Sequence, residues 1–244
     1  MIKNAIVVLL LILISSCKTI YIHHQKHQLA FSSPQLASIG FNKDKLIHNH
    51  FKTIGFPELT QKIRVYVRSV PFNKTTYKAY ASLREKNGQL TTITYIDSLP
   101  NKPHYIQLMI SDHVTLKETI NHPENKGLLN YLKNDSEYKI VTSIAMVSSD
   151  KLQKALIDAE EIYLIQNDSE HAAMLQLIKN KKAIRSIHLS TITPFAYHPS
   201  SFCWGFDRKY QPQIEIISND YSRCPINTYK KAYKLQKERQ YLNL

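Results

Sequence analysis

The chain has 244 residues and a formal net charge of +13, because 32 Lys and Arg residues outnumber 19 Asp and Glu residues. This length is sufficient for one large hydrophobic core or two small ones. No two of the five glycines lie close enough to form a glycine-rich phosphate-binding loop, which excludes the P-loop and dinucleotide-binding classes.

The first 17 residues have the pattern of an export signal. Lys3 precedes an unbroken apolar run from Ala5 to Ile14. This run is too short for a membrane span of about 20 residues but long enough for the apolar core of a secretory signal. The Ile-Ser-Ser-Cys that follows it, ending at Cys17, resembles the lipobox of bacterial lipoproteins. The resemblance covers residues 1–17 only.

The resemblance implies cleavage before Cys17, a diacylglyceryl group on its sulfur, and usually acylation of the new amino terminus. Two or three acyl chains anchor a protein stably to a membrane. Lys18, in place of Asp, implies sorting to the outer membrane of a bacterial cell envelope, with the orientation left open. The alternatives are an ordinary signal peptide with a chance cysteine, or an uncleaved signal anchor.

Export also determines which partners suit a basic chain. Cleavage removes one basic residue, Lys3, and lowers the net charge from +13 to +12. We expect no nucleic acid as a partner outside the cytoplasm. Anionic lipid headgroups, cell-wall polymers and acidic proteins are the available partners, and a solvated basic surface with no dedicated partner is the alternative.

The mature chain is predicted to begin with a polar tether over residues 18–40, followed by a single domain over residues 41–244. The first predicted element is a helix over residues 42–54, with Asn42 as its cap and Gly55-Phe56-Pro57 as its end.

Strands are predicted next. Residues 63–68 alternate apolar and polar side chains. Residues 77–84 and 90–96 flank Asn87-Gly88, which predicts a hairpin because both residues tolerate positive φ. Residues 105–110 are a further apolar strand.

Two fourteen-residue segments, 108–121 and 145–158, align without gaps and share four identities. Each is predicted to be a strand that ends in a Ser or Asp capping a helix. Independent selection of capping residues explains the similarity better than an internal duplication does.

The last part of the chain is predicted to contain a meander of strands over residues 161–166, 173–178 and 184–190, then a short strand over residues 214–217. A basic helix begins at about Thr228 and either meets anionic headgroups or docks on its own domain. Together these elements predict an α+β fold, with a mostly antiparallel sheet, a few helices and a C-terminal basic helix.

Cys203 and Cys224 remain after lipidation of Cys17, and export predicts that they form a disulfide. Such a bond would stabilise the fold by roughly 3 kcal/mol. The alternative is a pair of free thiols.

His23, His24 and His27 are the best metal candidates, because His23 and His27 would lie one turn apart on a helix. No carboxylate or thiolate lies nearby in sequence to complete a site. We therefore expect no metal and no other cofactor, and we interpret the stretch as a polar spacer. For the pair at 48 and 50, we expect His50 to pack and His48 to be solvated.

Cys203 invites comparison with two groups of cell-wall enzymes. The Asp-Cys-Ser-Gly motif of cysteine peptidases is not matched. The L,D-transpeptidases have a histidine upstream of the cysteine, as His188 and His198 are here, but their Ser-x-Gly-Cys-x-Arg signature is absent. A nucleophilic Cys203 also needs a free thiolate, which a bond to Cys224 forbids.

The sequence thus predicts a lipid-anchored envelope lipoprotein that works by binding or as a structural component. One alternative is an envelope cysteine hydrolase or transpeptidase that uses Cys203 and His198. Another is an immunity or inhibitor lipoprotein that binds an acidic protein.

Overall fold

The computed structural model describes residues 19–44, 49–167, 172–219, 223–235 and 237. The expected signal sequence, its lipidation site Cys17, and His48 lie outside these residues. None of the helices in the described ranges is both long and apolar enough to cross a bilayer.

Strands dominate the structure, and in the described part of the chain twelve of them form one sheet. Every pairing recorded between them is antiparallel. The predicted α+β class with a mostly antiparallel sheet is confirmed. The strands are β1 (Thr19–Ile22), β2 (Gln25–Leu29), β3 (Ile39–Asp44), β4 (Asn49–Gly55), β5 (Ile63–Pro71), β6 (His104–Ile110), β7 (Lys139–Met146), β8 (Glu161–Asn167), β9 (Ala172–Lys179), β10 (Lys182–His188), β11 (Pro194–Phe206) and β12 (Pro212–Ser218).

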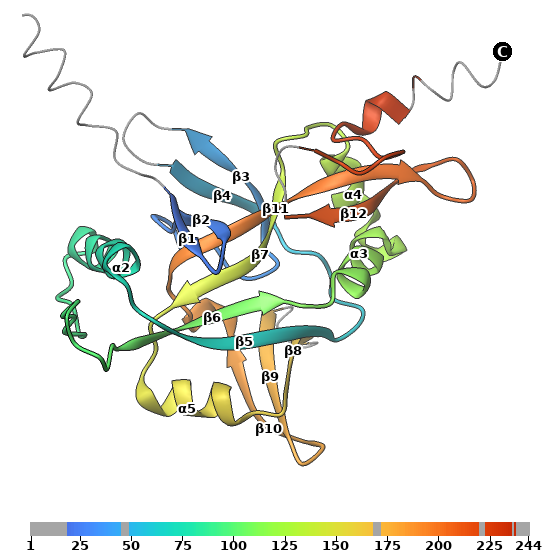
Figure 1. The fold of residues 1–244 in the computed structure, drawn as a ribbon. Helices are drawn as coiled ribbons and strands as arrows, with labels where there is room; N and C mark the ends of the chain where they lie inside the picture. Colours follow the sequence, from blue (N-terminus) through green and yellow to red (C-terminus); the bar gives the residue numbers. More distant parts are fainter. Residues whose placement is uncertain (1–18, 45–48, 168–171, 220–222, 236, 238–244) are drawn as a thin grey trace, which may run out of the picture.

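Helices pack on this sheet and on one another (Figure 1). Helix α2 (Lys74–Lys86) lies against β1 and β11, and α3 (His113–Asn121) lies against β12. Helix α4 (Lys126–Leu132) follows α3, and α5 (Asp150–Asp158) packs on β5 and β9. The other helical segments of the described chain are two short 3-10 turns, Pro123–Asn125 and Leu189–Thr191, and a short stretch that begins at Ala232.

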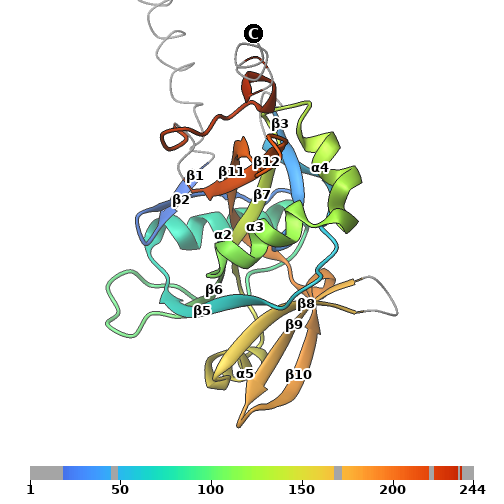
Figure 2. The ribbon, with the colours of Figure 1, turned by 90° about the vertical axis from the view of Figure 1, so that its right-hand side faces the viewer.

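The long strand β11 is the point where the sheet branches. Its first part pairs with β7 on one edge and β2 on the other, and its second part pairs with β12. The register against β7 shifts between His198 and Pro199. This bulge explains how a proline, which has no N–H to donate, is accommodated in a central strand. Figure 2 shows that β8–β10 and α5 lie at the end of the molecule opposite β3 and the C-terminal residues.

Two apolar clusters form the core. The larger one fills most of the molecule and includes Ile106, Leu108, Ile144 and Trp204. The smaller one lies beneath α2 and contains Phe72, Tyr80, Tyr105 and Phe195, together with Ala145 and Ala196. Helix α2 therefore covers only one part of the sheet face on which it lies.

Several predicted elements are confirmed. The strands expected near residues 63–68, 105–110, 161–166, 173–178, 184–190 and 214–217 correspond to β5, β6, β8, β9, β10 and β12. The two similar segments form β6–α3 and β7–α5, with Asp112 and Ser149 as the N-caps of their helices. Helices α3 and α5 pack on different strands, so the two strand–helix units do not share one packing arrangement.

The helix predicted over residues 42–54 is wrong, since this segment forms the hairpin of β3 and β4. Ile39 and Phe51 are buried, whereas Lys52 is exposed. Gly40 permits the close approach of the two strands, because a Cβ atom there would collide with the backbone carbonyl of Lys52. Backbone pairing between the two strands, which approach closely at Gly40, prevailed over the apparent helical face.

The hairpin predicted over residues 77–96 is also wrong, because residues 74–86 form α2. Asn73 caps this helix at its start, in a reciprocal capping box with Thr76. At its end, Gly88 N–H donates to the Glu85 carbonyl and Gln89 N–H donates to the Arg84 carbonyl. Gly88 has φ +65°, so Asn87-Gly88 ends a helix in a Schellman motif instead of turning a hairpin.

Two boundaries need correction. The tether expected over residues 18–40 is wrong, because β1 and β2 pair with each other and β2 joins β11. The alternation of buried Ile20 and Ile22 with exposed Tyr21 shows why the segment folds. At the other end, the helical residues begin at Ala232 rather than Thr228, because Tyr229 forms an antiparallel bridge with Trp204.

Candidate functional site

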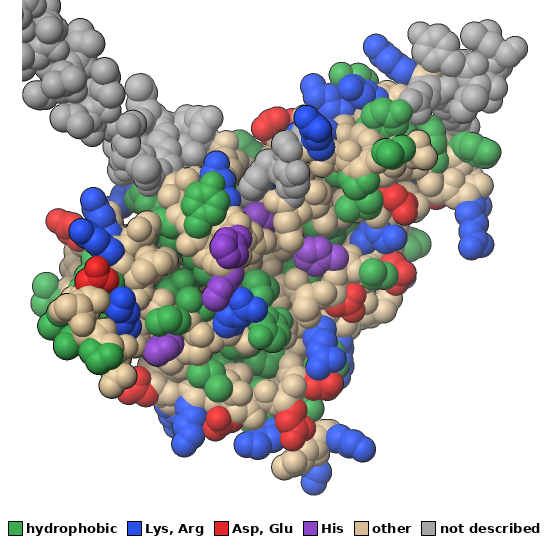
Figure 3. Space-filling model, in the orientation of Figure 1, with side chains coloured by type: hydrophobic (Ala, Val, Ile, Leu, Met, Phe, Trp, Pro, Cys, Tyr) green, Lys and Arg blue, Asp and Glu red, His purple; other side chains and the backbone are tan. Residues whose placement is uncertain are grey.

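A polar, histidine-lined pocket occupies the part of the sheet face that α2 leaves uncovered. It is open to solvent and has a volume of about 620 Å³. Figure 3 shows histidine side chains gathered near the centre of this face, beside Lys and Arg side chains. The lining residues are His23, His24, Gln25, Lys26, Arg68, Gln107, Met109, His198 and Asn219.

The β1–β2 hairpin supplies one wall of the pocket through a strained turn. His23 and His24 form the two-residue connection between the paired residues Ile22 and Gln25, with φ values of 45° and 64°. This left-handed conformation suits Asn or Gly better than His. Strain of this kind tends to occur at functional sites, and here it places two exposed imidazoles at the mouth of the pocket.

A buried chain of hydrogen bonds forms the floor. The Nδ1 atom of His27 lies 3.0 Å from the Gln25 carbonyl. Because a carbonyl only accepts, Nδ1 carries the proton and donates to it. The Nε2 atom of His27 then accepts from the Ser143 hydroxyl at 3.2 Å, and the Ser143 oxygen accepts from Gln107 Nε2 at 3.2 Å. One network thus joins β2, β6 and β7.

The same network orients the amide of Gln107 toward the pocket. Its nitrogen is used by Ser143, and its Oε1 atom finds no hydrogen-bond partner among the described residues. Gln107 is only 1% exposed, so this oxygen is a buried acceptor just beneath the pocket that Gln107 lines. A buried acceptor without a partner is costly, and a ligand hydroxyl or amine would relieve that cost.

Burial keeps the two inner histidines neutral. Desolvation, with a smaller contribution from the neighbouring His198, lowers the pKa of His27 to about 4, although the hydrogen bond to the Gln25 carbonyl opposes the shift. Desolvation also lowers the pKa of His198, although hydrogen bonds with the Lys26 carbonyl and Asn219 oppose the shift. The rings of His27 and His198 lie 5.6 Å apart, so two neutral imidazoles are the favoured state at neutral pH.

The charges that remain in the pocket are positive. The basic side chains are Arg68 on β5 and Lys26 on β2, and the guanidinium of Arg68 lies over the Tyr66 ring at 5.4 Å. None of the described residues that line the pocket is Asp or Glu. Cationic side chains on a concave surface suit an anionic group, which Arg binds in bidentate geometry.

The Ser143–His27 pair resembles a nucleophile and its base only in its connectivity. Ser143 and His27 are 1% and 0% exposed, and neither lines the pocket. A base whose pKa has fallen to about 4 is also a poor proton acceptor at neutral pH. The pair therefore holds strands together and orients Gln107.

The structure brings two of the predicted metal candidates, His23 and His24, to the pocket, and it buries His27 beneath them. The interpretation of this stretch as a spacer is wrong. Across the described ranges, no three His, Cys, Asp or Glu side chains are grouped in a way that could hold a metal ion. His50 lies on β4 beside the Phe31 ring.

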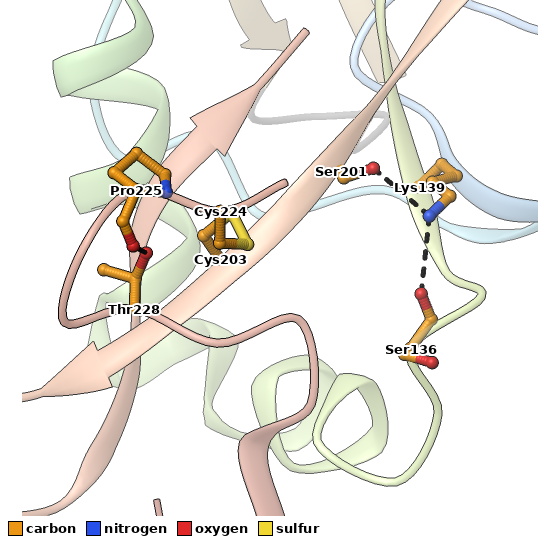
Figure 4. Close-up of a disulfide and its surroundings, with 7 residues drawn as sticks. All are labelled: Ser136, Lys139, Ser201, Cys203, Cys224, Pro225 and Thr228. Atoms are coloured by element: carbon orange, nitrogen blue, oxygen red, sulfur yellow. Dashed lines mark hydrogen bonds between the residues drawn. A yellow bond between two sulfur atoms is a disulfide. The ribbon is translucent and has the colours of Figure 1, made fainter. Parts of the chain in front are cut away.

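Cys203 and Cys224 form the predicted disulfide, with their Cα atoms 5.6 Å apart. Figure 4 shows this bond between β11 and the segment that ends the described chain, near the Lys139 amine. Lys139 donates to the Ser201 hydroxyl at 3.2 Å and to the Ser136 carbonyl at 3.4 Å. Cys203 is 0% exposed, so in this structure it offers no thiolate for catalysis.

Four residues of the candidate site escaped the sequence analysis: Lys26, Arg68, Gln107 and Ser143. A detectable signal was present for two of them, because Gln107 and Ser143 are polar residues inside otherwise apolar strands. Arg68 looked like an ordinary solvent-facing residue of an alternating strand. Comparisons with protein-family models, with curated proteins and with solved structures found no match for the chain.

Proposed function

We propose that this protein is a lipid-anchored lipoprotein of the bacterial cell envelope that binds an anionic ligand in the histidine-lined pocket. The observation that carries the proposal is the chemistry of the pocket. Arg68 and Lys26 supply positive charge, and no carboxylate occurs among the described lining residues. The expected location, at the outer membrane, rests on the lipobox resemblance and on Lys18.

The disulfide supports the envelope part of this proposal. Bonds such as Cys203–Cys224 persist in oxidising compartments, including the bacterial periplasm, and are rare in the cytosol. The same bond argues against the cysteine hydrolase or transpeptidase alternative, because its nucleophile would be occupied.

The pocket also restricts the ligand class. Arg68 and Lys26 call for a phosphate or carboxylate, whereas Gln107 Oε1 calls for a hydroxyl or amine donor. A volume of about 620 Å³ exceeds the needs of a bare phosphate and matches a small-molecule site. A phosphorylated or carboxylated sugar unit, free or as part of a cell-wall polymer or lipid headgroup, combines these features.

An intact mass spectrum under non-reducing conditions tests the anchor. The protein extracted from its native membrane should begin at an acylated Cys17 and be lighter than its reduced form by the two hydrogens of one disulfide. An uncut chain would overturn the lipoprotein assignment. Free thiols at Cys203 and Cys224 would reopen the enzyme alternative.

Calorimetric titration with glucose 6-phosphate, inorganic phosphate and glucose tests the ligand. We expect affinity to fall in that order, because glucose lacks the charge and phosphate lacks the hydroxyls. Arg68→Gln should weaken glucose 6-phosphate binding about tenfold or more, as loss of a charge-assisted hydrogen bond does. The matched control is Arg64→Gln, on the same strand, whose partner Glu161 lies 3.4 Å away. Equal losses in both variants would contradict the site.

The immunity or inhibitor alternative uses the same positive charge, because an acidic side chain of a protein can enter an open pocket. It predicts no binding of glucose 6-phosphate and instead one saturable protein partner whose affinity falls with salt and with Arg68→Gln.

A further inference from the structure

The folded domain begins very close to the proposed lipid anchor. Strand β1 starts at Thr19, two residues after Cys17, and two residues extend the chain by at most about 7 Å. This argument rests on the proposed lipidation of Cys17. If that residue carries the acyl chains, no tether separates the domain from the bilayer, and part of the domain surface must lie against the headgroups.

The C-terminal basic segment, defined as the described residues between 223 and 237, is suited to such a surface. Its side chains include Arg223, Lys230, Lys231, Lys234 and Lys237, and its described residues include no Asp or Glu. Ile226 is 90% exposed and Tyr233 is 47% exposed. The amines of Lys231 and Lys237 lie 5.7 Å and 5.8 Å from the Tyr233 ring.

The fold holds this segment in place. Cys224 is bonded to Cys203, and Tyr229 exchanges two backbone hydrogen bonds with Trp204, at 2.7 Å and 2.9 Å. Ala232 and Leu235 are 2% and 1% exposed and pack on the larger core. The exposed lysines, Ile226 and Tyr233 are therefore presented on a fixed base.

The segment also lies in the appropriate half of the molecule. In both ribbon views, the start of β1 and the C-terminal residues occupy the half that contains β3, β11 and β12 (Figures 1 and 2). The β9–β10 hairpin and α5 project from the opposite end. A bilayer next to Thr19 can thus reach the C-terminal basic segment without contacting the β9–β10 hairpin.

We propose that the C-terminal basic segment docks on the anionic headgroups of the membrane in which Cys17 is anchored. Lys and Arg clusters near a membrane are attracted to anionic lipids. An exposed aliphatic side chain and a tyrosine suit the boundary between headgroups and acyl chains. Asp135 lines a pocket together with Lys230 and Lys231, and its carboxylate offsets part of their positive charge. Lys234 and Lys237 are therefore the better positions for substitution.

The experiment uses the full acylated protein, reconstituted in vesicles of phosphatidylethanolamine and phosphatidylglycerol with brominated acyl chains as quenchers. A fluorophore is attached at Ile226→Cys, or at Ile184→Cys as the matched control. Ile184 is 51% exposed on β10, at the far end. We expect quenching at position 226 and little at position 184, and less at position 226 in purely zwitterionic vesicles.

Charge reversal provides the second arm. Lys234→Glu with Lys237→Glu should abolish most of the quenching at position 226, whereas Lys179→Glu with Lys182→Glu, an equal charge change on the β9–β10 hairpin, should leave it intact. Equal losses in the two variants, or equal quenching at positions 226 and 184 in the acylated protein, would overturn the docking proposal alone. A mass spectrum without acyl chains would overturn the proposed function itself.

Discussion

Two parts of one sheet face, built on the same strands, have opposite characters. Beneath α2, strands β6, β7 and β11 contribute Tyr105, Ala145 and Phe195 to an apolar cluster. A few residues away, the same strands contribute Gln107, Ser143 and His198 to the histidine-lined pocket and its floor. The strands supply a continuous scaffold, and the helix determines which part becomes core.

The two parts are stabilised by different physical means. The covered part gains from apolar burial and from ring contacts, such as Phe72 with Tyr105 at 4.9 Å between centroids. The uncovered part depends on a hydrogen-bond network whose members must remain in defined protonation states. It follows that they should respond differently to truncation, to acid and to removal of surface charge.

Truncation in the covered part should have the largest effect. Phe72 is 1% exposed and contacts four aromatic rings. Phe72→Ala should lower the free energy of unfolding by about 3–5 kcal/mol, measured by urea denaturation. Leu90→Ala, at a residue that is 89% exposed, is the control and should change it by less than about 0.5 kcal/mol.

Acid should lower the free energy of unfolding mainly through the uncovered part of the sheet face. The pKa of His27 falls from 6.5 to about 4 on folding, so between these values the unfolded chain binds a proton that the folded chain does not. The stabilising contribution is complete above pH 6.5 and is lost as the pH falls toward 4. The loss should be roughly 3 kcal/mol, measured by urea denaturation from pH 7.5 to 4.5.

The control for the acid effect is His27→Gln, which removes the titrating group. It should reduce stability at pH 7.5 and flatten the decline between pH 6.5 and 4.5. An unchanged decline would assign the acid sensitivity to other groups.

Removal of one hydroxyl should measure how much the hydrogen-bond network contributes to stability apart from the apolar core. Ser143→Ala leaves His27 Nε2 and Gln107 Nε2 without their shared partner and should cost about 1–3 kcal/mol. Ser69→Ala, at an exposed position on β5, should cost almost nothing. If Ser143→Ala were neutral in the same denaturation assay, the floor would not depend on this network.

Substitution of Arg68 should have the smallest effect on stability and the greatest effect on ligand binding. Arg68→Gln should change the free energy of unfolding by less than about 0.5 kcal/mol, while it weakens glucose 6-phosphate binding. A loss above about 1 kcal/mol would show that Arg68 belongs to the fold rather than to a site. Denaturation and titration of one preparation make the comparison direct.

The sequence predicted strands well where one face is buried and one is exposed. Ile63 and Val65 on β5 alternate with exposed Arg64 and Tyr66, and this period is visible without a structure. The sequence predicted structure poorly where a turn-forming pair of residues can occur in more than one kind of structure. Asn87-Gly88 suits a hairpin and a helix end equally, and only the capping box at Asn73 distinguishes them.

The central strand was the largest omission. Pro194 and Pro199 in β11, with two serines after the second proline, give it the composition of a loop. A bulge at Pro199 and pairing on both edges make it a strand, and neither is encoded locally. The pocket was missed for a related reason, because Arg68, Gln107 and His198 lie far apart in the chain and meet only through strand pairing.

The short hairpin of β1 and β2 links the proposed anchor at Cys17 to the pocket. Thr19 opens its first strand and His23 opens its turn, a separation of four residues, or about 13 Å along a strand. If Cys17 carries lipid, as proposed, the pocket is confined to a thin layer above the bilayer. Ligands carried by that membrane are then met at a high effective concentration, as in an intramolecular encounter, and the search for them takes place in two dimensions.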